Sequence, residues 1–165
     1  MIVTHLKHVK EPNNKNSLNI LSIDIYEVKI PFRFRYGHAK AKHTGVKSIV
    51  SVARDSEGRE GYGEAVPRTY VTGETSASVQ DSIPELIRHI DLGRSTLENF
   101  RDSLANIETA LFEENSVPGC ALCALDLAVT DLAARQQAIP VSQVLGFRSW
   151  DRRRKTTSPI PPRSE

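Results

Sequence analysis

The hydrophobic pattern of the chain changes its period once, near Pro67, and this change restricts the fold more than any other feature. Before Pro67, residues 19–32 (NILSIDIYEVKIPF) alternate in polarity and are rich in β-branched and aromatic residues, which is typical of a strand. After Pro67, apolar residues recur at spacings of three and four, which is typical of amphipathic helices. Strands followed by helices predict an α+β domain whose helices pack on one face of an antiparallel sheet.

The sheet is predicted to be a meander of about three strands. The second strand, within residues 44–55 (TGVKSIVSVARD), and the third, within residues 60–67 (EGYGEAVP), flank a hairpin turn in which Gly58 supplies a permissive backbone. Residues 32–43 (FRFRYGHAKAKH), between the first and second strands, are expected to be part strand and part loop, with a bend near Gly37.

Three to four helices are predicted after the sheet. The first starts from an N-cap at Thr75 or Ser76, and Pro84 is expected to kink or divide it because proline removes a backbone donor. The second lies within residues 95–117, the third opens on Pro118, and a short last helix ends on Gly146, a common C-cap residue. The predicted core stripes are Val79, Ile83, Leu86, Ile87 and Ile90; Leu97, Phe100, Leu104, Ile107 and Leu111; and Leu122, Leu125, Val129 and Leu132. Ala121, Ala124 and Ala128 are expected to give the third helix a smooth face for close approach.

Composition places the chain among ordinary globular proteins, with 39% hydrophobic and 25% charged residues and a formal net charge of +2. Residues 1–18 are polar and are predicted to be a disordered leader, and residues 19–146 are predicted to form the domain. Residues 147–165 are predicted to be a basic, proline-containing tail. No apolar run approaches the length of a membrane span and no secretory h-region is visible, so we expect a cytoplasmic protein without a membrane partner.

The isolated acidic side chains are not predicted to form a catalytic or metal site. Glu64 follows Gly61 and Gly63, where a tight structural turn is expected. Asp126 and Asp131 are five residues apart on a helix, roughly 140° around its axis, so they do not converge on one ion. Capping or side-chain-to-backbone roles are expected for both.

The cysteines, the histidines and the basic tail are likewise given structural interpretations. Cys120 and Cys123 form a C-x-x-C that opens an alanine-rich helix instead of following a strand, so buried small side chains are expected there, not a redox motif. The basic cluster at residues 152–155 lacks an aromatic platform, which makes nucleic acid an unfavoured partner. The five histidines, which show no metal-binding spacing, are His5, His8, His38, His43 and His89.

An ordered series of motifs carries a family resemblance. The hairpin ends in Gly-x-Gly-Glu-Ala at residues 61–65, and a later helix reads Ala-Leu-Asp-x-Ala-x-x-Asp-Leu at residues 124–132. Pro140 and a Leu-Gly at residues 145–146 follow. Over residues 19–146 this series resembles the N-terminal capping domain of the enolase superfamily, in the mandelate racemase and muconate-lactonizing enzyme group, and is similar to dipeptide epimerases.

The resemblance implies chemistry that needs more than this sequence. Such enzymes abstract a proton α to a carboxylate with a Lys or His base and hold the enediolate on Mg²⁺, in epimerase, racemase or cycloisomerase reactions. Their ligands and bases lie on a (β/α)₈ barrel of roughly 250 residues. Only nineteen residues follow Gly146, so we expect the truncated start of a barrel, no cofactor bound by this chain and no activity of the chain alone.

The resemblance also implies partners and contacts. The partners would be a barrel, missing or supplied in trans, and a small carboxylate or dipeptide substrate, contacted by two loops of the capping domain. The implied substrate-binding residues are Phe32, Phe34, Tyr36 and His38 in the first loop and Arg68, Tyr70, Val71 and Thr72 in the second. The alternative for the aromatic residues is packing on the sheet. The alternative function is a stand-alone interaction module that pairs with a separately encoded barrel or another protein.

Overall fold

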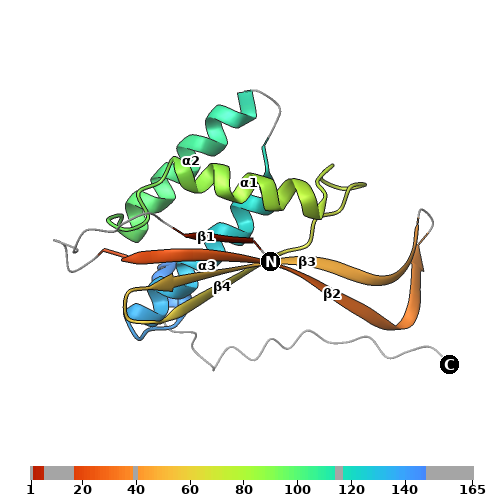
Figure 1. Ribbon diagram of the computed structural model, residues 1–165, viewed down its shortest axis with the longest axis horizontal. Helices are drawn as coiled ribbons and strands as arrows, with labels where there is room; N and C mark the ends of the chain where they lie inside the picture. The colour runs from red at the N-terminus through yellow and green to blue at the C-terminus, as the bar shows by residue number, and fades with distance from the viewer. Residues whose placement is uncertain (1, 6–16, 39–40, 114–116, 148–165) are drawn as a thin grey trace, which may run out of the picture.

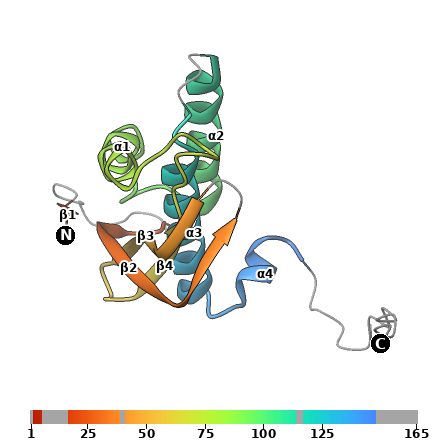
Figure 2. The ribbon, with the colours of Figure 1, turned by 90° about the vertical axis from the view of Figure 1, so that its right-hand side faces the viewer.

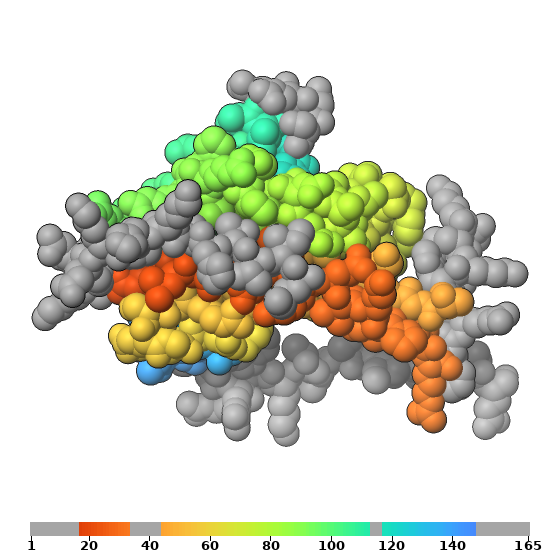
Figure 3. All heavy atoms as spheres, in the orientation of Figure 1, coloured from red at the N-terminus to blue at the C-terminus, as the bar shows by residue number. Residues whose placement is uncertain are grey.

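The computed structural model describes residues 2–5, 17–38, 41–113 and 117–147, in which an antiparallel sheet is followed by helices (Figure 1). The sheet has the order β1-β2-β3-β4, and its strands are β1 (Ile2–His5), β2 (Ile20–His38), β3 (Ala41–Asp55) and β4 (Glu60–Ala65). The helices are α1 (Ser76–Arg88), α2 (Leu97–Glu113), α3 (Gly119–Gln136) and α4 (Val141–Val144). The predicted α+β class is confirmed, and Figure 3 shows α1 and α2 as a layer above the strands.

Strands β2, β3 and β4 are the three predicted strands, and the structure adds a fourth. Residues Ile2–His5, inside the segment expected to be a disordered leader, form β1 and pair antiparallel with residues 22–25 of β2. At the other end of that segment, Leu18 is buried and its N–H donates to the carbonyl of Ser95 (2.9 Å). The expectation of disorder is therefore wrong for these residues, because bonds to distant backbone order them and no local pattern reports such bonds. Residues 6–16 and 148–165 lie outside the described part of the chain.

The hairpin of β2 and β3 is longer than predicted. Both strands run through most of the segment expected to be part loop, and their pairing is interrupted between Pro31 and Tyr36, where the register shifts. The tight turn between β3 and β4 is present, with Gly58 in the left-handed region at φ +79°. Its positive φ is the reason that glycine suits this position.

One face of the sheet holds the core. Ile23 and Ile25 of β2 are buried on this face. On β3, the buried residues Ala53, which pairs with Ile23, and Ile49 lie on the same face. Helices α1 and α3 pack against this face, and α2 packs against α3 (Figure 2). The helical stripes predicted from spacing supply the rest of the core, and the largest side chain among them, Phe100 of α2, is fully buried.

Gly61 and Gly63 lie inside strand β4 and not in a turn, so the expected structural turn is wrong. Neither has a positive φ; both are buried and face α3. A Cβ atom at Gly63 would lie 2.1 Å from the carbonyl oxygen of Ala124, and one at Gly61 would lie 2.3 Å from that of Ala128. The two glycines therefore allow helix α3 to approach the strand backbone, and the smooth alanine face predicted for α3 is the surface that they meet.

Helix α1 begins as predicted and contradicts the expected division at its proline. Thr75 is the N-cap: its hydroxyl accepts a hydrogen bond from the Ser78 N–H (3.0 Å), and the Ser78 hydroxyl accepts one from the Thr75 N–H (2.9 Å). The helix continues through Pro84 to Arg88. Loss of one backbone hydrogen bond is tolerated there because the helix buries an apolar face on both sides of Pro84.

A buried carboxylate, Asp55, ties the β3–β4 turn to the end of α3. Its oxygens accept hydrogen bonds from the N–H groups of Glu57 and Arg59 (2.9 Å each), from Arg59 Nε (2.7 Å) and from Gln136 Nε2 (3.0 Å). Gln136 also donates to the carbonyl of Leu18 (2.6 Å). Burial alone would raise the pKa of Asp55, but the hydrogen bonds from Gln136 and Arg59 outweigh it and hold the pKa below its usual value.

Candidate functional site

The two loops implied in substrate contact lie at the same end of the molecule. The segment that follows β4 and the far half of the β2–β3 hairpin extend beyond the helical layer on one side (Figure 1). Between them is a cavity of about 510 Å³. It is lined by Glu27, Gly45, Lys47, Pro67, Arg68, Thr69, Tyr70, Glu74, Thr75, Ser76, Ala77 and Gln80. The fold therefore joins residues about 40 positions apart in the sequence into one concave surface.

The loop that forms one wall of this cavity is held by its own backbone. The carbonyl of Arg68 accepts hydrogen bonds from the N–H groups of Val71 (2.8 Å) and Thr72 (2.9 Å), which closes a turn. The Thr72 hydroxyl also lies 3.4 Å from the Arg68 carbonyl and from the N–H of Glu74. Gly73 follows with φ +77°, a conformation that a residue with a side chain rarely adopts.

Glu74 fastens the same loop to the start of α3. Both of its carboxylate oxygens lie within hydrogen-bond distance of the Cys120 N–H, at 3.0 and 3.1 Å. This N–H belongs to the first turn of α3, whose N-cap Pro118 offers no side-chain cap. A carboxylate satisfies the exposed amide and interacts favourably with the positive end of the helix dipole. The cavity wall is therefore joined to the domain core.

The floor of the cavity is the continuation of the core face of β2. Alternation places Glu27 and Lys29 on the same face as Ile23 and Ile25, so this face becomes charged where α1 begins. The Glu27 carboxylate pairs with Lys29 Nζ (3.4 Å) and with Lys47 Nζ of β3 (3.6 Å). Partial burial would raise the pKa of Glu27, but the two lysines outweigh it and lower this pKa. The carboxylate is therefore ionised and locally neutralised.

The structure brings two of the implied substrate-binding residues to the cavity. Arg68, half-buried, and Tyr70, with 54% of its surface exposed, both line it. Val71 is 70% exposed and is not a lining residue, while Thr72 stabilises the turn. Phe32 is half-buried on β2 and does not line the cavity. The side chains of Phe34, Tyr36 and His38 lie outside the described part of the structure.

Sequence reasoning did not identify Glu27, Lys47 or Glu74 at this site. The pairing of Lys29 with Lys47 across β2 and β3 depends on strand register, which no local motif specifies. Glu74 directly precedes the N-cap Thr75, and its role depends on the Cys120 N–H, 46 residues further along the chain, which no local capping pattern indicates.

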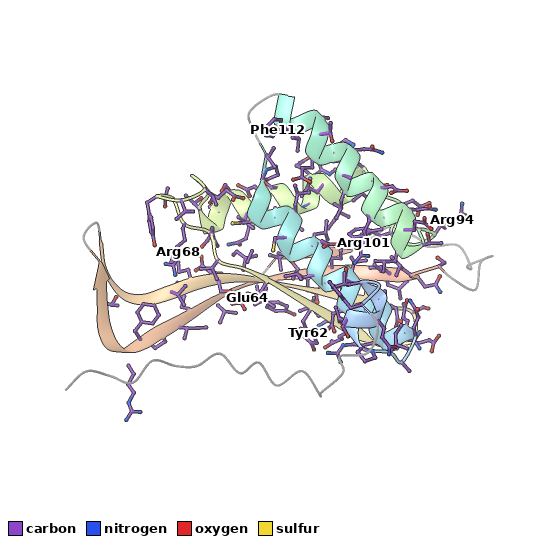
Figure 4. All side chains as sticks on the ribbon, turned by 180° about the vertical axis from the view of Figure 1, so that it is seen from behind. Tyr62, Glu64, Arg68, Arg94, Arg101 and Phe112 are labelled. Atoms are coloured by element: carbon purple, nitrogen blue, oxygen red, sulfur yellow. The ribbon has the colours of Figure 1, made fainter. Side chains whose placement is uncertain are left out.

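The three isolated acidic residues, Asp131, Asp126 and Glu64, each contact other side chains or backbone of the domain. The Asp131 carboxylate accepts a hydrogen bond from the Tyr62 N–H on β4 (3.0 Å), which is the side-chain-to-backbone role predicted for it. Asp126 instead lies 3.7 Å from Arg101 Nε. Glu64 is on the exposed face of β4, where the Ser48 hydroxyl donates to it (Figure 4).

The C-x-x-C motif holds two free thiols. Cys120 is half-buried, but Cys123 is exposed, so the expected burial is wrong for the second cysteine. Burial and the neighbouring Glu74 carboxylate raise the pKa of Cys120 to about 11, and burial raises that of Cys123. A thiol with a raised pKa is a poor nucleophile near neutral pH, which disfavours redox chemistry at this motif.

The described part of the chain holds neither a metal-ligand cluster nor a membrane-spanning helix. Across residues 2–5, 17–38, 41–113 and 117–147, no group of three or more His, Cys, Asp or Glu side chains could hold a metal ion. In the same residues, no helix is long and apolar enough to cross a membrane.

Comparisons with known proteins assign the fold and the family. Residues 23–146 match the family described as mandelate racemase/muconate lactonizing enzyme, N-terminal domain. The chain is 31% identical over 130 residues to the L-amino acid-D/L-Glu epimerase of Francisella philomiragia. The aligned region covers 79% of this chain and 35% of the relative.

Two solved structures share the fold. The L-Ala-D/L-Glu epimerase from Bacillus subtilis, in a substrate-liganded complex, is 24% identical with a TM-score of 0.66, over 77% of this chain and 34% of that one. The dipeptide epimerase from Methylococcus capsulatus, complexed with Mg and the dipeptide L-Arg-D-Lys, is 25% identical with a TM-score of 0.60, over 78% of this chain and 35% of that one. The chain thus spans about a third of the length of the relatives that it matches.

Proposed function

Because the chain belongs to the mandelate racemase/muconate lactonizing enzyme family, as its N-terminal domain, we propose that it is the capping domain of a Mg²⁺-dependent isomerase. The reaction proposed is abstraction of a proton α to a carboxylate, in an epimerase, racemase or cycloisomerase. The barrel that carries the base and the metal would lie elsewhere in the same polypeptide or on a separate one. In this proposal the chain by itself has no isomerase activity.

The cavity between the β2–β3 hairpin and the loop after β4 is the single observation that supports this role best. It is concave, it opens at one end of the sheet, and its loop wall is held in place by backbone hydrogen bonds and by Glu74. A rigid wall of this kind suits the binding of the part of a substrate that is remote from the reacting carbon. Closure of such a wall over a barrel mouth excludes water and improves selectivity.

The proposed division of labour leaves proton transfer and metal binding to the barrel. The described residues offer no cluster of ligands that fits Mg²⁺, so no step of the reaction is assigned through a metal on this chain. Arg68 and Tyr70, which line the cavity, are proposed to contact substrate. The remaining implied contacts, Phe32, Phe34, Tyr36, His38, Val71 and Thr72, are proposed to border the substrate when the domain closes.

A chimeric enzyme tests the proposal. Residues 19–146 replace the matching region of the L-amino acid-D/L-Glu epimerase of Francisella philomiragia, and epimerisation of a dipeptide panel is measured with Mg²⁺. We expect the chimera to be active and the 165-residue chain alone to be inactive. In the chimera, Tyr70→Ala should raise KM with a smaller effect on kcat, because the residue would bind the remote part of the substrate. Turnover by the chain alone, or a folded chimera without turnover, would contradict the proposal.

Exposed apolar side chains support a second candidate, a stand-alone interaction module. Leu145 and Phe147, after α4, are 48% and 66% exposed, and Leu127 of α3 is 45% exposed. Exposed apolar surface is typical of a face that a partner covers. Size-exclusion chromatography of the chain with a separately expressed barrel tests this candidate: co-elution supports it, and independent elution at micromolar concentration contradicts it.

A further inference from the structure

The loop between β4 and α1 has little packing of its own to fix its shape. Residues 69–73 are all exposed, and Val71 is 70% exposed. Gly73 has a positive φ, and nothing lies within 4 Å of the Cβ position that it lacks. Burial therefore contributes little to the conformation of residues 69–73, which depends on hydrogen bonds.

A chain of hydrogen bonds runs from this loop to the first turn of α3. The Arg68 carbonyl accepts from the N–H groups of Val71 and Thr72, and the Thr72 hydroxyl lies 3.4 Å from the Glu74 N–H. The Glu74 carboxylate accepts from the Cys120 N–H, at 3.0 and 3.1 Å from its two oxygens. The Cys120 thiol is also hydrogen-bonded to Glu74 and Thr72. The loop and the helix are therefore joined through both backbone and side chain.

The helix end of this chain of bonds is a fixed point. Cys120 is half-buried and packs against the hydrophobic core. Helix α3 lies close to β4, because Gly61 and Gly63 place no side chain between the two backbones. A carboxylate at the first turn of a helix also interacts favourably with the positive end of the helix dipole. The Glu74 carboxylate thus connects an exposed loop to the most closely packed part of the domain.

From these contacts we infer that Glu74 is a positioning residue for the cavity. By binding the first turn of α3, it holds residues 68–73 in the conformation in which Arg68 and Tyr70 line the cavity. Its own carboxylate is engaged by α3, so it acts on a substrate only through those two side chains. This inference rests on the proposed function, because the order of the loop matters to a substrate only in that role.

Amide relaxation of the full 165-residue chain, labelled with ¹⁵N, tests the inference without any catalysis. In the wild type, the order parameters of Val71 and Thr72 should be near that of a rigid backbone, about 0.85. In Glu74→Ala they should fall below about 0.6, the range of a flexible backbone. Glu74→Gln, which keeps an oxygen acceptor without the charge, should give an intermediate loss. The matched control Glu85→Ala, at an exposed ion pair of α1, should leave both values unchanged.

The amide of Gly58 separates a local effect from a general loosening of the domain. It donates to the Asp55 carbonyl (3.2 Å) in the β3–β4 turn, which is tied to the other end of α3. Its order parameter should be the same in the wild type and in all three variants. Unchanged values for Val71 and Thr72 in Glu74→Ala, or an equal loss at Gly58, would overturn the inference.

The chimeric enzyme supplies a second readout that a purely structural role would not change. Glu74→Ala should raise KM about fivefold with a smaller effect on kcat, as loss of a helix-capping interaction would. Because Glu74 acts through Tyr70, the double variant with Tyr70→Ala should raise KM by less than the product of the two single factors. Factors that multiply, or an active chimera whose KM is unaffected by Glu74→Ala, would contradict the positioning role alone. An inactive chimera, together with the expected loss of order in the chain, would contradict the proposed function alone.

Discussion

The close approach of α3 to β4 predicts that Gly63→Ala is strongly destabilising. The added Cβ would lie 2.1 Å from the Ala124 carbonyl oxygen and 2.5 Å from the Ala128 nitrogen. Both are backbone atoms, so no side-chain rotation relieves the clash. To reach an ordinary contact distance of 3.4 Å, the helix must move away from the strand by about 1.3 Å.

The cost follows from the displaced packing. Overpacking a well-packed interior costs about 1–3 kcal/mol, and a clash between two backbones should lie at the upper end, at about 3 kcal/mol. The effect on the unfolded state opposes this, because Gly→Ala lowers the entropy of the unfolded chain and stabilises by about 0.4–1 kcal/mol at an unstrained site. The sign of the measured change therefore distinguishes a steric role from simple backbone flexibility.

Urea unfolding followed by circular dichroism at 222 nm measures the change. With an m-value of roughly 2 kcal/mol/M, a loss of about 3 kcal/mol lowers the midpoint by roughly 1.5 M. Gly119→Ala is the matched control, since nothing lies within 4 Å of its added Cβ at the start of the same helix. A Gly63→Ala midpoint equal to or above those of the wild type and of Gly119→Ala would refute the steric argument.

Three further predictions concern groups around the loop and the turn. Glu74→Gln should lower the free energy of unfolding by about 1 kcal/mol and accelerate hydrogen exchange of the Cys120 amide. The control Glu85→Gln, at an exposed helical ion pair, should change stability little, and equal effects of the two variants would contradict the anchoring role of Glu74. At pH 7, iodoacetamide should modify the exposed Cys123 before Cys120, and it should modify both thiols more slowly than free cysteine, as measured by mass spectrometry. Modification of Cys120 at the rate of free cysteine would contradict its raised pKa. The pKa of Asp55 is lowered in the folded state, so its contribution to stability is complete above its unfolded pKa and is lost as the pH falls through the folded pKa. Urea midpoints measured from pH 6 to pH 3 should therefore decline less in Asp55→Asn than in the wild type. Parallel curves for the two proteins would contradict this prediction.

The elements of the fold could be predicted from local patterns because local physics sets them. Alternation in residues 19–32, the left-handed turn residue Gly58 and the N-cap Thr75 each depend on neighbours within a few positions. The buried stripes of α1 and α3 appear at the predicted positions because helical spacing determines which side chains share a face. The motif order was sufficient to identify the family, which the match over residues 23–146 confirms.

The remaining features depend on which elements meet. Gly61 and Gly63 suggested a turn by their residue type, but α3 packs across them, and this contact gives them their role. Strand β1 depends on bonds to β2 some twenty residues away, which outweigh a weak local preference. The same holds for the cavity, because the register of β2 and β3 and the attachment of Glu74 to α3 decide its charges.

The sequence by itself therefore determined the class of fold, the order of its elements and the family, because periodicity, capping and motif spacing are local properties. Only the tertiary structure decided which loop wall faces which strand and which charged side chains meet at the cavity. Such pairing depends on distances in space between residues that are far apart in the chain, and those distances exist only once β2 has paired with β3 and α3 has packed on the sheet.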